Sequence, residues 1–286
     1  MSKLKINLIG PGRVGQTMLG LLRDVPECLV QDVLGPRPAS AKQAVEAAGA
    51  GRAVETYADL RPADLWALTV PDSQISTVAG EVAKVFKGRE APAPTAFHCS
   101  GYFPADQMAP LGDLGWHLAS VHPVLTFSDA ASAIRQFDGT YCGVEGDRPA
   151  LDLIEPLLEK LGAYPFEIKS ENKSLYHAAA VISNNFTVVL QAIAREAWSV
   201  AGVPDEIAQD LNATLLRATY ENVTARGPAE ALTGPAARGD EAVVTEQGKD
   251  VARWHPAAGV LYKQLSTLAR NVKTRGTTRP DHGSDT

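Results

Sequence analysis

The chain has 286 residues, of which 45% are hydrophobic and 21% are charged, and its net charge at pH 7 is −6. This length allows one large or two ordinary domains, each with a substantial hydrophobic core. Lysine and arginine form no long run, which argues against nucleic-acid binding, because a phosphate backbone requires a basic surface. The three cysteines are widely spaced without a C-x-x-C pattern, which predicts reduced thiols and no metal site.

The sequence carries no pattern typical of targeting or membrane insertion. It enters an apolar strand almost at once, without the basic and apolar segments of a signal peptide. No uncharged apolar run reaches membrane-spanning length. We therefore expect a cytoplasmic protein whose partner is a small-molecule substrate, and we expect neither a membrane nor a nucleic acid as partner.

The stretch KINLIGPGRVG near the N-terminus gives the strongest functional signal. A β-favouring run ends at a complete G-x-G-x-x-G motif, and an apolar helical segment follows over residues 16–23. The first glycine allows a tight turn, the second lets a pyrophosphate approach the backbone, and the third lets the helix pack on the strand. The free amides at the helix N-terminus attract an anion. The residues expected to bind the pyrophosphate of a dinucleotide are Gly10, Gly12, Arg13, Val14 and Gly15.

The end of the second predicted strand, residues 29–34, decides between NAD and NADP. An acidic residue at this tip binds the ribose 2′-hydroxyl, whereas an arginine pairs with a 2′-phosphate. Asp32 lies too early in the strand, and Arg37 lies at the tip. Ser40 can cap the following helix and reach a phosphate. We predict NADP, with Arg37 and Ser40 at its 2′-phosphate; the alternative is a solvated Arg37, with NAD as the cofactor.

Further apolar strands alternate with helical segments along the first part of the chain. They are predicted at residues 65–70, 95–98, 117–121, 140–144 and 164–168. This alternation predicts an α/β fold with a doubly wound, mostly parallel Rossmann sheet. Ligands bind at the carboxyl ends of such strands. The strand-end residues expected to face the nicotinamide half of the cofactor are Val70, Pro71, Ser100 and Gly101.

The pattern becomes helical after the last predicted strand. Residues 170–201 contain neither glycine nor proline and predict one long helix, which is too polar to span a membrane and should form the core of a smaller all-helical domain. A second helix is predicted from residues 204–205 to about residue 225, and a last one over residues 256–272. The predicted organisation is a dinucleotide-binding domain (1–168), a helical substrate and dimerisation domain (169–272) and a flexible tail (273–286).

Polar residues share one stripe of the long predicted helix. At about 100° per residue, Lys173, His177, Ala180 and Asn184 lie close together around the axis. Lys173 and His177 are near enough along the axis to act together as proton donor and acceptor, while Asn184 is expected to hold the substrate or a structural water. The alternative is that Lys173 and His177 are ordinary solvent-exposed residues.

Several motifs occur together in an order that resembles a known family. They are GPGRVG, HCSG, the His122-Pro123 strand end, KSLYHAAAVISNNF and ALTGPAARGD. Up to about residue 270, the chain resembles a Rossmann-like, short-subunit dehydrogenase-like family with a helical C-terminal domain of unknown function. That family is similar to the 6-phosphogluconate dehydrogenase, ketopantoate reductase and pyrroline-5-carboxylate reductase group. The resemblance implies an NADP-type cofactor and a helical domain that often forms a homodimer.

The resemblance also bears on individual residues. Dehydrogenases of the group carry a K-x-x-x-N motif with an acid–base lysine; Lys173 matches that lysine, and His177 stands in the asparagine position. The group's pyrroline-type reductases have a small-residue loop near the substrate, and Thr233 and Gly234 are similar in position. Arg238 could bind a substrate carboxylate or pair with Asp240. Whether this loop serves its own site or a partner subunit's stays open.

A hydrolase is a weaker interpretation of the same residues. His98, Ser100 and His122 are nearby in sequence, but C-S-G lacks the glycine spacing of a nucleophile elbow. The sequence therefore predicts an NADP-dependent oxidoreductase that transfers a hydride between the nicotinamide and a small carbonyl, hydroxy acid or imine. The alternative is a non-catalytic sensor or regulator that binds NADP(H).

Overall fold

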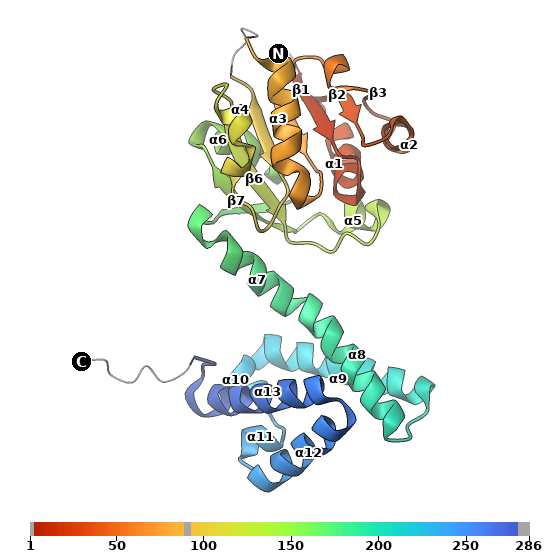
Figure 1. The fold of residues 1–286 in the computed structure, drawn as a ribbon, viewed down its shortest axis with the longest axis vertical. Coiled ribbons are helices and arrows are strands. Elements are labelled where there is room, and N and C mark those ends of the chain that lie inside the picture. The colour runs from red at the N-terminus through yellow and green to blue at the C-terminus, as the bar shows by residue number, and fades with distance from the viewer. Residues whose placement is uncertain (1–2, 89–92, 280–286) are drawn as a thin grey trace, which may run out of the picture. The chain divides into compact units, whose positions relative to one another are not determined.

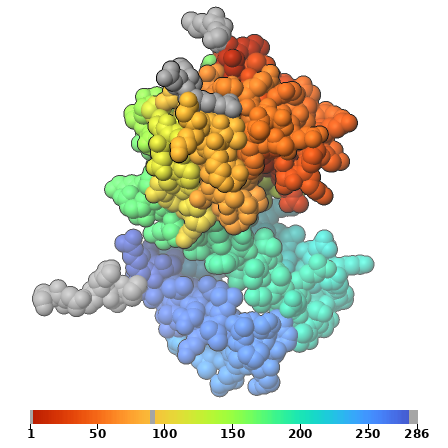
Figure 2. Space-filling view, turned by 45° about the horizontal axis from the view of Figure 1, so that its top comes forward, coloured from red at the N-terminus to blue at the C-terminus, as the bar shows by residue number. Residues whose placement is uncertain are grey.

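The computed structural model describes residues 3–88 and 93–279, and the chain divides into two compact units, Met1–Ser183 and Asn184–Thr286. The division lies later than the predicted boundary at residue 168. The reason is that α7 (Lys173–Ser183) is attached to the sheet by hydrogen bonds of Lys173 and Tyr176. Figure 1 shows the sheet and its helices, and Figure 2 shows the outer surface of one face of the first unit in space-filling form.

The first unit is built on an eight-stranded sheet with the order β3-β2-β1-β4-β5-β6-β7-β8. The strands are β1 (Leu4–Ile9), β2 (Cys28–Leu34), β3 (Arg52–Val54), β4 (Leu65–Leu68), β5 (Thr95–His98), β6 (His117–Pro123), β7 (Tyr141–Gly146) and β8 (Tyr164–Glu167). Among the strand pairs of the described residues, β6–β7 is antiparallel and the others are parallel. The predicted doubly wound, mostly parallel sheet is confirmed, although β3 was too short to be predicted.

Helices cover both faces of this sheet (Figure 1). They are α1 (Arg13–Arg23), α2 (Pro38–Ala48), α3 (Ile75–Phe86), α4 (Ala109–Gly112), α5 (Ala130–Gln136) and α6 (Arg148–Lys160). One apolar cluster joins the sheet to α1, α2 and α6, and a second joins it to α3 and α4. Strands with helices on both faces are apolar throughout, and every residue of β4 is buried.

The position of the site follows from the strand order. The chain builds β2 and β3 on one side of β1 and then crosses to β4 on the other side. Neighbouring connections therefore leave the sheet in opposite directions between β1 and β4, which opens a crevice at their carboxyl ends. Ile9 and Leu68 are paired at these ends, immediately before the glycine turn and Thr69.

The second unit contains only helices among its described residues. They are α8 (Asn185–Val200), α9 (Asp205–Arg226), α10 (Pro228–Ala231), α11 (Pro235–Arg238), α12 (Glu241–Trp254) and α13 (Pro256–Arg275). The helix predicted over 170–201 is divided at Asn184 into α7 and α8. Since α13 continues to Arg275, residues 273–275 of the predicted tail are helical; its residues 280–286 lie outside the described part of the chain.

The apolar residues of α8 are not buried within this single chain, contrary to the predicted helical core. Ser170–Val200 is long and apolar enough to cross a membrane by length and composition alone, and none of its most apolar window is buried. Such a segment by itself is weak evidence for a membrane. Large exposed apolar side chains of the second unit include Phe186, Val188, Val189, Ile207, Leu215, Tyr220 and Val260.

Candidate functional site

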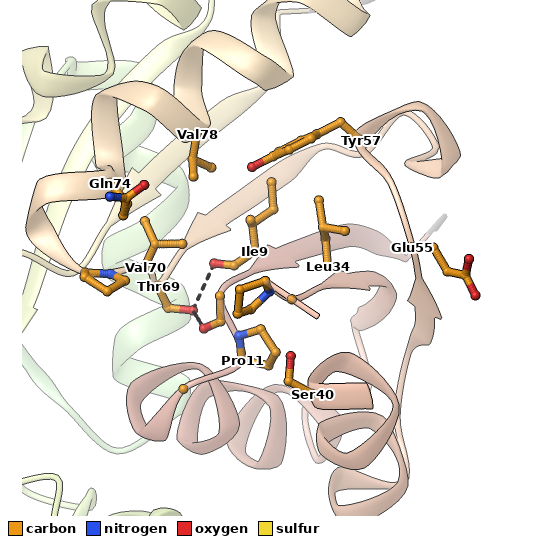
Figure 3. Close-up of a pocket in the computed structure, with 15 residues that line it drawn as sticks. Ile9, Pro11, Leu34, Ser40, Glu55, Tyr57, Thr69, Val70, Gln74 and Val78 are labelled. Atoms are coloured by element: carbon orange, nitrogen blue, oxygen red, sulfur yellow. Dashed lines mark hydrogen bonds between the residues drawn. The ribbon is translucent and has the colours of Figure 1, made fainter. Parts of the chain in front are cut away.

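The glycine turn after β1 is fixed to the end of β4. Gly10 has φ +94°, and a Cβ there would lie 2.6 Å from Val70 Cγ1 and 2.8 Å from the Thr69 carbonyl oxygen. The Thr69 hydroxyl donates a hydrogen bond of 2.8 Å to the Gly10 carbonyl (Figure 3). Gly15 is equally constrained, since its Cβ would lie 2.5 Å from the Gly10 carbonyl oxygen. A side chain at either position would clash with neighbouring protein atoms, so both glycines are required by the fold whether or not a ligand binds.

Gly12 differs from these two glycines because, apart from its own chain neighbours and the nearby backbone of α1, no protein atom lies within 4 Å of where its Cβ would be. It is the N-cap of α1, and no side chain caps that helix. The Gln16 amide donates to the Gly12 carbonyl, so the three amides between them lie at the helix N-terminus, where a phosphate is stabilised by the amides and the helix dipole. The open space at Gly12 therefore fits a pyrophosphate.

A cavity of about 610 Å³ opens beside this turn, at the carboxyl ends of β1, β2 and β4 (Figure 3). Its lining includes the predicted residues Gly10, Gly12, Ser40, Val70 and Pro71, together with apolar side chains and Tyr57. Its size and largely apolar lining suit the adenosine half of a dinucleotide. Tyr57 and Glu55, which sequence reasoning did not identify, reach the cavity because β3 extends the sheet beside β2.

Asp32 is excluded from this cavity by its own ion pairs. Its carboxylate is fully buried and lies 2.8 Å from the Arg52 guanidinium and 2.7 Å from that of Arg61. Burial alone would raise the pKa of Asp32, but hydrogen bonds from the two arginines outweigh it and hold the pKa below its ordinary value. Arg37 is exposed at the N-cap of α2, where its carbonyl accepts a 2.7 Å hydrogen bond from the Ser40 hydroxyl.

A second cavity, of about 220 Å³, lies at the carboxyl ends of β5 and β6. It is lined by Val14, Asp72, Cys99, Ser100, Gly101, His122, Pro123, Leu125, Phe127 and His177. Val14 belongs to the first turn of α1, so the two cavities both border the segment that forms the glycine turn and the start of α1. Ser100 and Gly101 were predicted to face the nicotinamide half and His177 to transfer a proton, while Val14 was predicted to bind the pyrophosphate. His122 was interpreted as a strand-end residue without a site role.

Two histidine rings meet beside Gly101 in this cavity. The rings of His122 on β6 and His177 on α7 are 5.8 Å apart between centroids and nearly perpendicular. A Cβ on Gly101 would lie 2.5 Å from His177 Cδ2 and 2.8 Å from His122 Nε2. Glycine at this position therefore allows both rings to approach the same point of the backbone.

Tyr176, which was also absent from the predicted site, contacts His122. Its hydroxyl lies 2.9 Å from His122 Nδ1. Burial, followed by the nearby His177 and Lys173, lowers the pKa of His122 to about 4, so the imidazole is neutral at pH 7. Burial raises the pKa of Tyr176 to about 12, which keeps its hydroxyl protonated.

Lys173 does not line the cavity, although it was predicted to act with His177 as a proton donor and acceptor pair. Its ammonium is 1% exposed and donates to the Ser100 carbonyl (3.0 Å) and the Ser120 hydroxyl (2.5 Å). Glu145 lies 3.8 Å away and accepts hydrogen bonds from the Ala105 amide and the Ser170 hydroxyl. Burial lowers the pKa of Lys173, and Glu145 opposes this effect. Lys173 thus holds the backbone that carries Ser100 and Gly101.

The polar side-chain atoms of Ser100 and His98 form hydrogen bonds with the backbone of the turn that follows β5. The Ser100 hydroxyl accepts hydrogen bonds from the amides of Tyr102 and Phe103. The Ser100 amide donates to His98 Nδ1, so the opposite ring nitrogen carries the proton and donates to the Pro104 carbonyl at 3.0 Å. Burial lowers the pKa of His98 to about 4. This geometry does not present Ser100 as an activated nucleophile.

The remaining predicted residues belong to the second unit. Asn184 is exposed, and its amide donates to the Asn185 side chain at 3.3 Å. Arg238 pairs with Asp240 at 3.0 Å and donates to the Thr233 carbonyl at 2.7 Å, so the ion pair considered for this loop is present. Gly234 is the N-cap of α11.

Comparisons with known proteins agree with this fold. Residues 140–269 match a family described as a domain of unknown function, DUF2520. A solved protein from Thermotoga maritima is 26% identical, with a TM-score of 0.73 over 94% of this chain and 98% of that one. A protein from Bacteroides fragilis, provisionally named an NADP oxidoreductase, is 22% identical, with a TM-score of 0.72 and the same coverage.

A more distant similarity links the chain to a Plasmodium falciparum pyrroline carboxylate reductase crystallised with NADP bound. It is 11% identical, with a TM-score of 0.54 over 94% of this chain and 99% of that one. No curated protein matches the sequence. The Rossmann-like sheet followed by a helical region is therefore a shared architecture, whereas the expected likeness to short-subunit dehydrogenases finds no support.

Proposed function

We propose that the protein is an NADP-dependent oxidoreductase that transfers a hydride between the nicotinamide and a small carbonyl, hydroxy acid or imine. The observation that carries this proposal is that two cavities border one segment. The larger includes Gly10 and Gly12 in its lining, and the smaller includes Val14 and two histidines. A ligand that lies across the N-terminus of α1 can enter both, as a dinucleotide does in this fold. The similar proteins named for NADP support the same function.

Each part of the cofactor has residues that fit it. The amides of Arg13, Val14 and Gly15 would bind the pyrophosphate, and the larger cavity would hold the adenosine half. Val70 and Pro71 line the larger cavity and would lie beside the adenosine half, not the nicotinamide half for which they were predicted. Ser100 and Gly101 line the smaller cavity and would border the nicotinamide, which when bound supplies or accepts the hydride. The protein's part is to orient this ring, exclude water and supply a proton to the substrate heteroatom.

The preference for NADP rests on the tip of β2. Asp32 cannot accept a hydrogen bond from a ribose 2′-hydroxyl without giving up its pairing with Arg52 and Arg61. Arg37 has an exposed guanidinium at the start of α2, and Ser40 lines the larger cavity. A 2′-phosphate would be stabilised by this arginine and by the helix N-terminus.

The proton chemistry would take place in the smaller cavity, which His177 enters from α7. Lys173 would act by positioning the Ser100–Gly101 backbone, because its ammonium is used for hydrogen bonds behind that turn. This differs from the lysine role that the K-x-x-x-N resemblance implies.

The test is NADPH oxidation with a panel of keto acids, aldehydes and cyclic imines, alongside direct measurement of NADPH binding. We expect binding and turnover of at least one class, and we expect His177→Ala to reduce turnover more than NADPH affinity. Ser174→Ala, at an exposed position on the same helix, is the control and should leave both unchanged. Binding without turnover across the panel would favour a sensor, and the absence of binding would refute the proposal.

We also propose that two copies of the chain pair through their helical units. The support is the set of large apolar side chains that α8 and α9 leave exposed in a single chain. Exposed apolar area on this scale is typical of an interaction surface. A second copy offers the same apolar surface, which an isologous dimer would bury on both sides.

A further inference from the structure

We infer that His122 donates the hydrogen bond and its Nε2 proton to the reacting oxygen or nitrogen of the substrate, and that Tyr176 restores the charge balance by giving its own hydroxyl proton to Nδ1 of the same ring. This inference rests on the proposed hydride transfer and adds two residues to it. Three observations support it: the β6–β7 register and the two glycines, Gly143 and Gly101, that lie beside the His122 ring.

The first glycine involved is Gly143. In the antiparallel β6–β7 ladder, Gly143 is the register partner of His122. A Cβ on Gly143 would lie 2.5 Å from the Tyr176 hydroxyl oxygen. Glycine weakens a strand interior and often marks a close approach by another group. Here the absent side chain makes room for the phenol beside His122.

The second glycine, Gly101, is close to the opposite side of the imidazole. Tyr176 contacts Nδ1 at 2.9 Å, whereas Nε2 is the ring atom that approaches Gly101 most closely. His122 and Gly101 both line the smaller cavity. One ring nitrogen therefore contacts a protein hydroxyl, and the other is near the backbone that borders the proposed nicotinamide position.

We assign one tautomer to the neutral ring, since the 2.9 Å contact between the Tyr176 hydroxyl and His122 Nδ1 fits a hydrogen bond in either direction. The Tyr176 hydroxyl has its hydrogen available to donate, and Nδ1 then accepts it, which leaves the hydrogen of the imidazole on Nε2. Nε2 can donate to a substrate carbonyl or imine in the cavity. Tyr176 thus acts as the hydroxyl that fixes the ring's hydrogen-bonding direction.

The reaction step balances in protons and electrons. As the substrate carbon accepts the hydride, the C=O π electrons move to oxygen, which takes the Nε2 proton of His122. Nδ1 takes the Tyr176 hydroxyl proton at the same time, so the ring remains neutral and the phenolate is reprotonated by water. An alkoxide is a stronger base than a phenolate, even with the pKa of Tyr176 raised to about 12, so this proton movement is favourable.

Lys173 supports the arrangement without entering the cavity. Its ammonium donates to the Ser100 carbonyl and to the Ser120 hydroxyl, and the latter donates to the same carbonyl at 3.1 Å. These bonds fix the backbone immediately before Gly101. The distance between the turn and His122 is therefore set by a buried network and not by a mobile loop.

The experiment compares Tyr176→Phe with wild type and with Tyr164→Phe, a control at an exposed tyrosine on β8. Tyr176→Phe keeps the ring but removes the hydroxyl. We expect kcat to fall by about 10²-fold, as is usual when a general acid is lost. The dissociation constant for NADPH should stay unchanged, and the control should behave as wild type. An unchanged kcat in Tyr176→Phe would overturn the inference.

A second readout does not depend on turnover. Nitrogen NMR of the histidine side chains should show His122 in wild type with its proton on Nε2, and Tyr176→Phe should shift this ring toward a tautomer mixture. A proton on Nδ1 in wild type would overturn the inference whatever the activity. If the tautomer and its loss are as expected but no substrate is turned over, the hydride-transfer proposal fails instead.

Discussion

Gly143 lies directly opposite His122 across the β6–β7 ladder, and its missing side chain leaves space for the Tyr176 hydroxyl to reach the imidazole. Because β6 and β7 are the antiparallel pair of the sheet, this register brings the carboxyl end of β6 beside the start of β7. The α-helix that follows the sheet, α7, then supplies His177 to the cavity and Tyr176 to the His122 imidazole that lines it. The site is therefore assembled from strand register as much as from the glycine turn.

Removing Lys173 should destabilise the fold. In Lys173→Ala, the buried Glu145 loses its cationic neighbour while the Ser100 carbonyl loses a donor, and breaking a buried pair costs about 3 kcal/mol. Urea unfolding should show this loss. Lys249→Ala removes an exposed pair with Glu246 and should change the free energy of unfolding by less than about 1 kcal/mol. Equal effects of the two substitutions would contradict the role given to Lys173.

Cofactor preference should depend on Arg37. Arg37→Ala removes the cation proposed to pair with the 2′-phosphate, so NADPH affinity should fall about tenfold or more while NADH affinity changes little. Isothermal titration with both nucleotides measures this difference. Lys84→Ala, which removes an exposed cation paired with Glu81, is the control. A similar loss for both nucleotides would remove Arg37 from the 2′-phosphate site.

Stability should decline as the pH falls from about 6.5 toward 4. Burial lowers the pKa of His98 from 6.5 to about 4, and the opposing effects of its hydrogen bond to the Pro104 carbonyl and of nearby Asp72 and Asp106 are smaller. Between these pH values the unfolded chain binds a proton that the folded chain excludes, so unfolding becomes more favourable as the pH drops, by up to about 3 kcal/mol for this group.

The matching measurement is the free energy of unfolding at several pH values in wild type and His98→Gln. The variant is expected to be less stable at pH 7 but to lose less stability on acidification. His122 has a pKa lowered in the same direction and should account for part of the remaining decline. If the free energy of unfolding fell equally steeply with decreasing pH in both proteins, His98 would not be the group responsible for the loss of stability.

The protein should be a dimer that forms through the exposed apolar face of the second unit. Light scattering is expected to give twice the chain mass of 30.3 kDa for wild type. Val188→Glu, on α8, should shift the protein toward monomer, whereas Leu29→Glu, at an exposed apolar position on β2, should not. A monomeric wild type, or wild type that binds lipid vesicles through this face, would contradict the dimer.

The sequence was informative where function depends on local spacing. The G-x-G-x-x-G run predicted the strand, turn and helix around Gly12, and the strand-end rule identified Ser100 and Gly101 as cavity residues. Helical periodicity also selected His177. These features depend on residues adjacent in the chain or on the general rule that parallel strands end at the same edge.

The parts that sequence reasoning missed depend on long-range pairing. His122 looked like an ordinary strand-end histidine, because only the β6–β7 register reveals the space above Gly143 that Tyr176 fills. Lys173 was assigned to the cavity from its helical position, but Ser120 and Glu145 bury it behind the turn. Helix periodicity indicates a direction around the axis and does not reveal which strands lie there.

Binding of NADPH to Gly12→Ala tests the central claim most directly. Apart from neighbouring residues of the chain, no protein atom lies within 4 Å of the added Cβ, so the melting temperature should change little, while a methyl group at the proposed pyrophosphate position should weaken NADPH binding at least about tenfold. Gly80→Ala, equally free of contacts on α3, is the matched control and should bind as wild type. Wild-type affinity in Gly12→Ala would contradict a dinucleotide site at this turn.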